Sequence, residues 1–240
     1  MTKLIILLFA AGLITCSQSQ TSIVYQISTY DDPGFANRIS DHKQSLKRLS
    51  DAGVFSNLSS KLTNSLSEVH KNFFRGNPDY EVISFSRGDL FQNQREDHVF
   101  VVYDKKSLKL IIIVYDEKTN RYCELYRGVQ VENGLLAAEC NFGHTYTLDY
   151  QLASEIIYLE ETLVMQPDIL MNLNLCKITD ISRDNTFILD RGCFSNQVPK
   201  TDFSSSLCIA TSSVYNNWEC MRYDKTKELF IIFYGQAFAD

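Results

Sequence analysis

The chain has 240 residues, of which 45% are hydrophobic, 12% aromatic and 22% charged. This composition is typical of a globular protein and excludes a mainly disordered, collagen-like or coiled-coil chain. The 23 basic and 29 acidic residues give a net charge of −6. This balance argues against a general nucleic-acid binder, because such proteins carry a basic surface.

The first residues have the layout of a secretory signal. Lys3 precedes an apolar run from Leu4 to Ile14, and polar residues follow from Ser17 to Gln20. The run is shorter than the roughly 20 residues that a membrane-spanning helix needs. The sequence therefore predicts a signal peptide over residues 1–19, with cleavage near residues 16–19 and no transmembrane helix.

Cys16 lies at the end of this segment, and two interpretations of it remain open. A signal peptidase that cuts near Ser17 or Ser19 would remove Cys16. Alternatively, Leu13-Ile14-Thr15-Cys16 resembles a bacterial lipoprotein box, which implies that Cys16 becomes a lipid-anchored first residue. We therefore expect a secreted, extracellular or periplasmic protein, with lipid anchoring as the alternative. Membrane contact is expected only if Cys16 is lipidated.

Residues 20–240 are expected to form one domain, with a helical part at 20–79 and a β-rich part at 80–240. After a short predicted strand from Ser22 to Ile27, Asp31-Asp32-Pro33-Gly34 indicates a helix start with an aspartate cap. Gly53 ends this helix, and a second helix follows. The residues that recur at helical spacing are Ile39, His42, Leu46 and Leu49, then Leu58, Leu62, Leu66, Val69 and Phe73.

The two predicted helices also carry a row of basic residues. Such a face could dock an acidic partner or a lipid head group, but a solvated face that covers a sheet is the preferred interpretation. The basic residues are Lys43, Lys47, Arg48, Lys61, Lys71 and Arg75.

From residue 80 onward the pattern changes to β-branched and aromatic strands separated by polar turns. Short connections predict antiparallel pairing, and residues 153–165 suit a helix. The fold class is α+β: an N-terminal helical pair followed by a meandering antiparallel β-sheet, stapled by disulfides. The expected strands are Tyr80–Ser86, Asp97–Tyr103, Leu108–Tyr115, Arg121–Tyr126, His144–Tyr150, Ile169–Thr179, Thr186–Leu189, Ser206–Ser213, Trp218–Tyr223 and Glu228–Tyr234.

Three of the predicted turns resemble one another, since Asp104, Asp116 and Asp224 each follow a tyrosine and precede lysine-containing residues. A repeated hairpin, as in a propeller, is one explanation. Because the intervals are unequal, we favour the other: Asp and Lys make a good turn after any aromatic strand end.

A different turn joins the first two predicted strands. Gly88-Asp89-Leu90-Phe91-Gln92-Asn93-Gln94-Arg95-Glu96-Asp97 is similar to the Gly-Asp-Leu-Asn-x-Asp-Gly-x-x-Asp turn of poorly characterised exported bacterial proteins, including FG-GAP-like repeats. In those proteins the turn binds Ca²⁺ through oxygen ligands. The resemblance implies that Asp89, Asn93 and Asp97 keep side chains with oxygen atoms that can bind Ca²⁺. Phe91 and Gln94 depart from the pattern, because they stand where an oxygen ligand and a turn glycine would be. We interpret the loop as a degenerate structural turn, and predict neither a metal site nor a cofactor.

Seven cysteines are an odd number, and assigning Cys16 to export leaves six. An even number in an exported chain indicates disulfides. Six cysteines allow 15 pairings, of which the simplest is three sequential bridges. The expected pairs are Cys123/Cys140, Cys176/Cys193 and Cys208/Cys220, with buried free thiols as the alternative for some of them.

No catalytic motif stands out. Asp97 and His98 resemble half of an acid–base pair, but neighbours in a strand point to opposite faces. The approach of His144 to Cys140 is not diagnostic of a nucleophile, and Glu155, Glu160 and Glu161 look like solvated charge. The four histidines, His42, His70, His98 and His144, lack metal-ligand spacing. Asn57-Leu58-Ser59 is a glycosylation acceptor if the source is a eukaryote.

The sequence thus favours a non-enzymatic exported protein that binds an unknown protein or glycan partner, and not nucleic acid, through exposed aromatic strand surface. The alternatives are a secreted hydrolase with an active site outside the known motifs and a degenerate calcium-stabilised module. A deep pocket with converging acids or histidines favours the hydrolase. A polar-rimmed apolar patch favours the binding protein.

Overall fold

A computed structural model describes residues 26–135, 145–189, 192–194, 203–212 and 217–236, with only the backbone described at Gly192 and Cys193. The predicted signal peptide, including Cys16, and nearly all of the first predicted strand lie outside these residues. None of the helices within the described ranges is long and apolar enough to cross a membrane.

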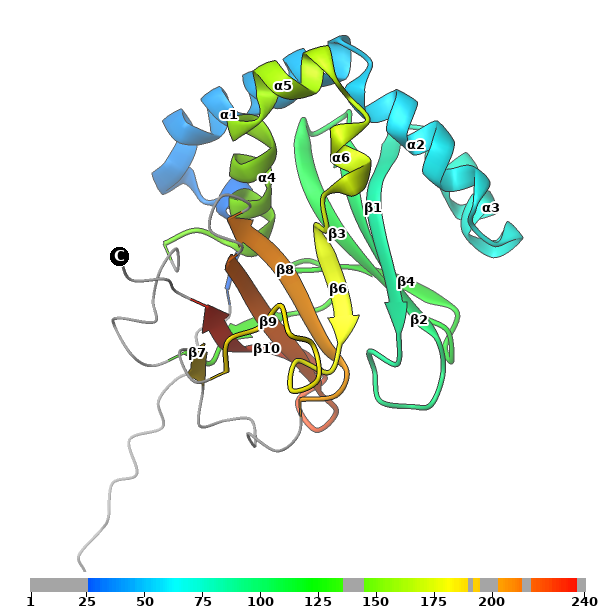
Figure 1. The fold of residues 1–240 in the computed structure, drawn as a ribbon, viewed down its shortest axis with the longest axis vertical. Coiled ribbons are helices and arrows are strands. Elements are labelled where there is room, and N and C mark those ends of the chain that lie inside the picture. The colour runs from blue at the N-terminus through cyan, green and yellow to red at the C-terminus, as the bar shows by residue number, and fades with distance from the viewer. Residues whose placement is uncertain (1–25, 136–144, 190–191, 195–202, 213–216, 237–240) are drawn as a thin grey trace, which may run out of the picture.

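The fold is α+β with two mainly antiparallel sheets, as the sequence predicts. Figure 1 shows the larger helices gathered along one end of the two sheets. The helices are η1 (Thr29–Asp31), η2 (Pro33–Phe35), α1 (Ala36–Asp51), α2 (Val54–Asn64), α3 (Glu68–Gly76), α4 (Leu148–Tyr158), α5 (Glu160–Met165) and α6 (Ile169–Asn172). The strands are β1 (Tyr80–Gly88), β2 (Asp97–Asp104), β3 (Lys109–Asp116), β4 (Arg121–Glu124), β5 (Val131–Asn133), β6 (Cys176–Thr179), β7 (Gly192–Phe194), β8 (Ser206–Ser212), β9 (Asn217–Asp224) and β10 (Leu229–Gln236).

The first predicted helix forms, and the second is divided into α2 and α3. Asp32 accepts a hydrogen bond from the Gly34 backbone N–H at 2.8 Å and caps η2, which leads directly into α1. Gly53 ends α1 with a φ of +77°, a conformation that glycine adopts without steric cost. The division between α2 and α3 lies at Ser65–Ser67, where Ser67 is extended and precedes the first residue of α3.

The first sheet has the strand order β1-β2-β3-β4 and is antiparallel throughout. The second has the order β5-β10-β9-β8-β6, with β7 also paired to β10. One pair in this sheet is parallel, because β5 runs alongside β10 from Val131 to Asn133. Strand β5 is not among the strands expected from the sequence.

Three of the expected strands are wrong in whole or in part. Residues 145–150 do not form a strand; α4 begins at Leu148, and Thr147 precedes it in an extended conformation typical of a helix cap. Ile169–Thr179 divides into the short helix α6 and strand β6. Thr186–Leu189 is irregular, and β7 follows it instead. In the first two cases a short run fits both a helix and a strand, and tertiary packing decides between them.

One apolar core lies between the inner faces of the two sheets and the helices α1, α2 and α4. Val99 and Val101 of β2 and Ile112 of β3 belong to the same buried cluster as Ile209 of β8 and Phe230 of β10. The sheets also meet along one edge, where β6 lies beside β1 (Figure 1).

This edge contact is a close approach of backbones. The Ile178 N–H donates to Ser86 Oγ at 2.9 Å. A Cβ on Gly88 would lie 2.7 Å from Ile178 Cγ2, so only glycine fits here without displacing β6.

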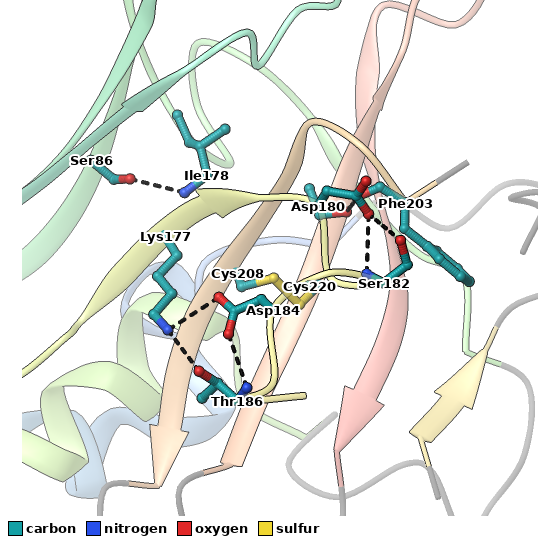
Figure 2. Close-up of a disulfide and its surroundings, with 11 residues drawn as sticks. Ser86, Lys177, Ile178, Asp180, Ser182, Asp184, Thr186, Phe203, Cys208 and Cys220 are labelled. Carbon is teal, nitrogen blue, oxygen red and sulfur yellow. Dashed lines mark hydrogen bonds and ion pairs between the residues drawn. A yellow bond between two sulfur atoms is a disulfide. The ribbon is translucent and has the colours of Figure 1, made fainter. Parts of the chain in front are cut away.

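Each sheet has a second, smaller cluster on its outer face. On the first sheet, Leu66 and Phe74 pack on Val82, Phe100 and Val102. On the second, the segment that follows β6 covers the disulfide between Cys208 and Cys220. Figure 2 shows this covering segment, in which Lys177 Nζ lies 3.4 Å from Asp184 Oδ2 and 3.1 Å from Thr186 Oγ1.

The three Asp-containing turns share one local geometry. The side chains of Asp104, Asp116 and Asp224 each accept a hydrogen bond from the backbone N–H two residues later, at 3.0, 2.9 and 2.8 Å. The residue four positions after each aspartate has a positive φ, between 53° and 55°. The three turns occur in two different sheets, so the likeness is a recurring turn chemistry and does not require a repeated fold unit.

The predicted Cys208/Cys220 bridge is confirmed, since the two residues are direct cross-strand neighbours in β8 and β9. The expectation that Cys123 and Cys176 are bridged is wrong, because both are free thiols. Cys176 is buried in the shared core with Sγ 3.9 Å from Ser84 Oγ, and Cys123 belongs to the edge strand of the other sheet. Cys140 and the side chain of Cys193 lie outside the described residues.

We expect alkylation to separate these cysteines. Burial raises the pKa of the Cys176 thiol to about 12, so this thiol should resist iodoacetamide at pH 8 in the native protein and react once guanidinium unfolds the chain. Cys208 and Cys220 should react only after reduction. Peptide mass mapping measures all three states. Alkylated Cys208 in an unfolded but unreduced sample would contradict the assigned bridge.

Candidate functional site

The turn between β1 and β2 holds the three residues of the calcium-like pattern. Asp97 is fully buried and accepts backbone N–H groups from Phe91, at 2.9 Å, and from Glu117, at 3.1 Å. Asp89 accepts the Asn93 N–H at 2.6 Å, and Asn93 Oδ1 accepts the Arg95 N–H at 3.0 Å. These oxygens therefore hold the backbone of the turn. Among the residues with described positions, no three or more His, Cys, Asp or Glu side chains are grouped to hold a metal ion.

Asp97 and His98 do not share a site, as strand alternation predicts. Asp97 Oδ2 and Oδ1 bind the backbone of the turn, whereas His98 contacts His70 of α3, with ring centroids 4.3 Å apart. Tyr115 and Tyr122 surround the two histidines, and Tyr122 Oη lies 2.6 Å from His70 Nδ1.

An open cavity of about 440 Å³ lies over this histidine pair. Burial and, to a smaller extent, the neighbouring His98 lower the pKa of His70 to about 4. Burial also lowers the pKa of His98. Both imidazoles are therefore neutral at pH 7. Sequence reasoning missed the pair because the two residues are 28 positions apart on a helix and a strand, and only the packing of α3 on β2 joins them.

A second feature is a group of exposed apolar side chains on the consecutive helices that lie between β5 and β6 in the chain. Tyr158 is 71% exposed, Val164 49%, Met165 74% and Met171 46%. They come from α4, α5 and α6, which follow one another directly in the chain (Figure 1). We call these four residues the helical patch. Of the six large apolar side chains that the described chain exposes, four lie in this short stretch.

The segment that carries the helical patch has no basic residues of its own, although Arg48 of α1 and Lys61 of α2 lie beside it. No lysine or arginine occurs in the sequence between Arg127 and Lys177. Glu160 pairs with Arg48 at 2.6 Å and Asp168 with Lys61 at 2.5 Å, and these pairs tie α5 and the start of α6 to α1 and α2. Glu161 is exposed within the same stretch.

A cavity of about 250 Å³ lies beside the α4–α6 helices, between them and the second sheet. Its lining includes Leu159, Leu173 and Trp218, together with Glu155 and three asparagines, Asn172, Asn174 and Asn217. The cavity combines an apolar floor with polar groups, as binding sites for a large side chain do.

The expected aromatic strand surface is wrong. No aromatic side chain on the described strands is exposed; Phe100, Tyr103, Phe230, Phe233 and Tyr234 are almost completely buried. Tyr103 and Phe230 belong to the shared core, whereas helices or loops cover Phe100, Phe233 and Tyr234 on the outer faces, which the strand pattern alone does not reveal. The exposed apolar residues are mostly on helices instead.

The other predicted residues have separate positions. Asn57 is exposed on α2, and Cys140 and His144 lie outside the described residues. Of the six basic residues on the predicted helices, Lys47, Arg48, Lys61 and Lys71 form ion pairs with acidic side chains. Much of the basic face is thus neutralised locally, which supports its interpretation as a solvated face.

Comparison with known proteins finds no family model, no characterised protein and no solved structure that matches this chain.

We expect acid to destabilise the fold through the histidines. The pKa of His70 is about 4 in the folded chain and near 6.5 in the unfolded chain. The unfolded chain therefore binds more protons as the pH falls from 6.5 towards 4, and the folded state loses stability over that window. His70→Phe should reduce the loss in the free energy of unfolding between pH 7 and pH 5 by roughly 1–2 kcal/mol.

Urea unfolding at pH 7, 6 and 5 measures this effect. His42 is the matched comparison, because burial lowers its pKa to about 4 as well. Its ring stacks on Tyr150, with ring centroids 3.8 Å apart. His42→Phe should remove a separate and similar part of the pH dependence. Equal pH dependence in the native protein and His70→Phe would show that His70 does not titrate across this window.

Proposed function

We propose that this protein is a non-enzymatic binding protein that is exported and then secreted or anchored through Cys16. It captures a partner protein through the helical patch. The observation that carries the proposal is the concentration of exposed apolar side chains at Tyr158, Val164, Met165 and Met171. Soluble proteins rarely expose several large apolar side chains together unless another surface covers them.

The chemistry of the patch selects a type of partner. Met165 and Met171 have flexible, polarisable side chains that adapt to the shape of an apolar partner. Glu161 and the absence of lysine and arginine from residues 128–176 favour positive charge around the partner's apolar residues. An amphipathic segment with basic residues beside its apolar face fits both requirements.

The cavity next to the patch supplies a place for an anchor residue. Leu159 and Leu173 lie on the segment that carries the patch, and Trp218 closes the cavity from β9. A large apolar side chain of the partner would fill this space, because interface affinity is concentrated in side chains that occupy pockets.

The hydrolase is the second candidate, and the cavity over His70 and His98 is the observation that favours it. His70 Nδ1 is engaged by Tyr122 Oη and not by a carboxylate. His98 Nδ1 has no hydrogen-bond partner in the described part of the chain. Neither Nδ1 atom is therefore bonded to the acid that orients a catalytic histidine in a Ser–His–Asp arrangement. We place this function behind the binding protein for that reason.

The test is site-specific crosslinking in the native medium of the protein. A benzophenone side chain at position 165 should crosslink one predominant partner with a basic apolar segment, and the same group at the exposed Arg183 should not. With the purified partner, Met165→Glu and Tyr158→Ala should each weaken binding at least ten-fold, and added salt should weaken the native complex.

Two outcomes would contradict the proposal. One is an equal crosslinking pattern from positions 165 and 183. The other is a partner whose affinity is unchanged by Met165→Glu. Turnover of a peptide, ester or glycoside that His70→Phe abolishes would favour the hydrolase instead.

A further inference from the structure

A cavity of about 380 Å³ lies between α2, α3 and the start of β1, away from the helical patch. Four hydroxyl side chains of α2 line it: Ser56, Ser59, Ser60 and Thr63. Their spacing of three, four and seven residues places them on one face of the helix. This face of α2 is hydroxylic, whereas the opposite face carries the buried Val54, Phe55 and Leu58.

The mouth of the cavity is basic. Lys71 and Arg75 come from α3, and Lys105 comes from the turn between β2 and β3. Lys71 lies 3.2 Å from Glu68, whose side chain is 73% exposed. An exposed ion pair of this kind contributes little stability, so Lys71 remains available to an anionic ligand.

Glu81 of β1 lines the same cavity, and its residue surface is only 8% exposed. Its Oε1 lies 3.6 Å from Lys105 Nζ. Its Oε2 is buried and has no hydrogen-bond partner in the described part of the chain. A buried carboxylate oxygen without a donor is costly, and a ligand that brings a hydroxyl group would relieve that cost.

These groups differ from those of a simple anion site. Phosphate or sulfate alone would meet the basic residues but would be repelled by Glu81. Sulfate offers no donor to Glu81 Oε2, and phosphate offers only the one or two P–OH groups that it keeps near pH 7. A ligand with several hydroxyl groups and one acidic group would satisfy both the basic residues at the mouth of the cavity and Glu81. The half-buried ring of Tyr80, which also lines the cavity, offers a face for the C–H groups of such a ligand.

We propose that the cavity between α2, α3 and β1 binds an acidic sugar, free or at the end of a glycan chain. Glu81 accepts a hydroxyl group of the sugar, the α2 hydroxyls bind further hydroxyl groups, and Lys71 and Arg75 hold its carboxylate or sulfate. The site is independent of the proposed function, because none of its lining residues belongs to the helical patch or to the cavity beside it.

The experiment titrates the intact protein with a defined set of sugars, followed by ligand-observed NMR and calorimetry. The acidic probes are D-glucuronate, D-galacturonate, N-acetylneuraminate and glucose 6-sulfate. The neutral probes are D-glucose and D-galactose, and inorganic phosphate and sulfate test for an anion site. At least one acidic sugar should bind with a Kd below about 5 mM, at least ten-fold tighter than its neutral counterpart.

Variants locate the binding. Glu81→Gln should weaken the binding of the best acidic sugar about ten-fold, because the charged hydrogen-bond acceptor is lost. Ser60→Leu should fill part of the cavity from the α2 side and leave Glu81 unchanged. Circular dichroism verifies that each variant is folded. Glu117→Gln is the matched control, since Glu117 belongs to the cavity over the histidines, and it should bind as the native protein does. Met165→Glu should also leave sugar binding unchanged.

Three results would overturn the proposal. The first is that no acidic sugar binds below 20 mM. The second is that phosphate or sulfate binds as tightly as the best sugar, which indicates an anion site. The third is that folded Glu81→Gln and Ser60→Leu both bind the sugar with native affinity.

Discussion

Burial of one apolar core between two twisted sheets is the constraint on which the rest of the molecule depends. The inner residues of β2 and β3 need the inner residues of β8, β9 and β10 as partners, and neither sheet is covered without the other. The contact between Gly88 and Ile178 fixes the distance between β1 and β6 at one edge. Helices α1, α2 and α4 contribute residues such as Leu46, Phe55 and Ile156 to the same core. Most of the large apolar side chains that the described chain exposes lie on helices, on the sides that point away from this core.

The local part of this fold could be predicted from the sequence, because it depends on chemistry within a few residues. The turns after Asp104, Asp116 and Asp224 are specified by an aspartate that accepts the N–H two residues later. Continuous runs of β-branched and aromatic residues then give the flanking strands nearly their observed extent. The Cys208–Cys220 bridge was predictable for the same reason, since both cysteines lie in neighbouring strands.

The parts that could not be predicted depend on contacts between distant segments. Strand β5 has only three residues, and its partner β10 lies about a hundred positions later. The face to which Cys176 points is decided by the position of β1, so its free thiol could not be inferred from its spacing to Cys193. Exposure is equally non-local: Tyr103 and Tyr158 are both tyrosines in apolar stretches, yet one is buried and the other is 71% exposed. The candidate sites follow from these contacts, and the sequence did not single them out.

The position of β10 also determines the order in which the molecule can be completed during synthesis. This strand pairs with β5, β7 and β9, so it joins the second sheet together although it is the last strand in the chain. The first sheet needs only residues 80–124, all of which leave the ribosome earlier. A nascent chain can thus form its first sheet early and pack α1 and α2 on part of its inner face, but the part that faces β9 and β10 stays open until Gln236 has emerged. A product truncated before β10 would carry this open face permanently and would be a substrate for chaperones and proteases.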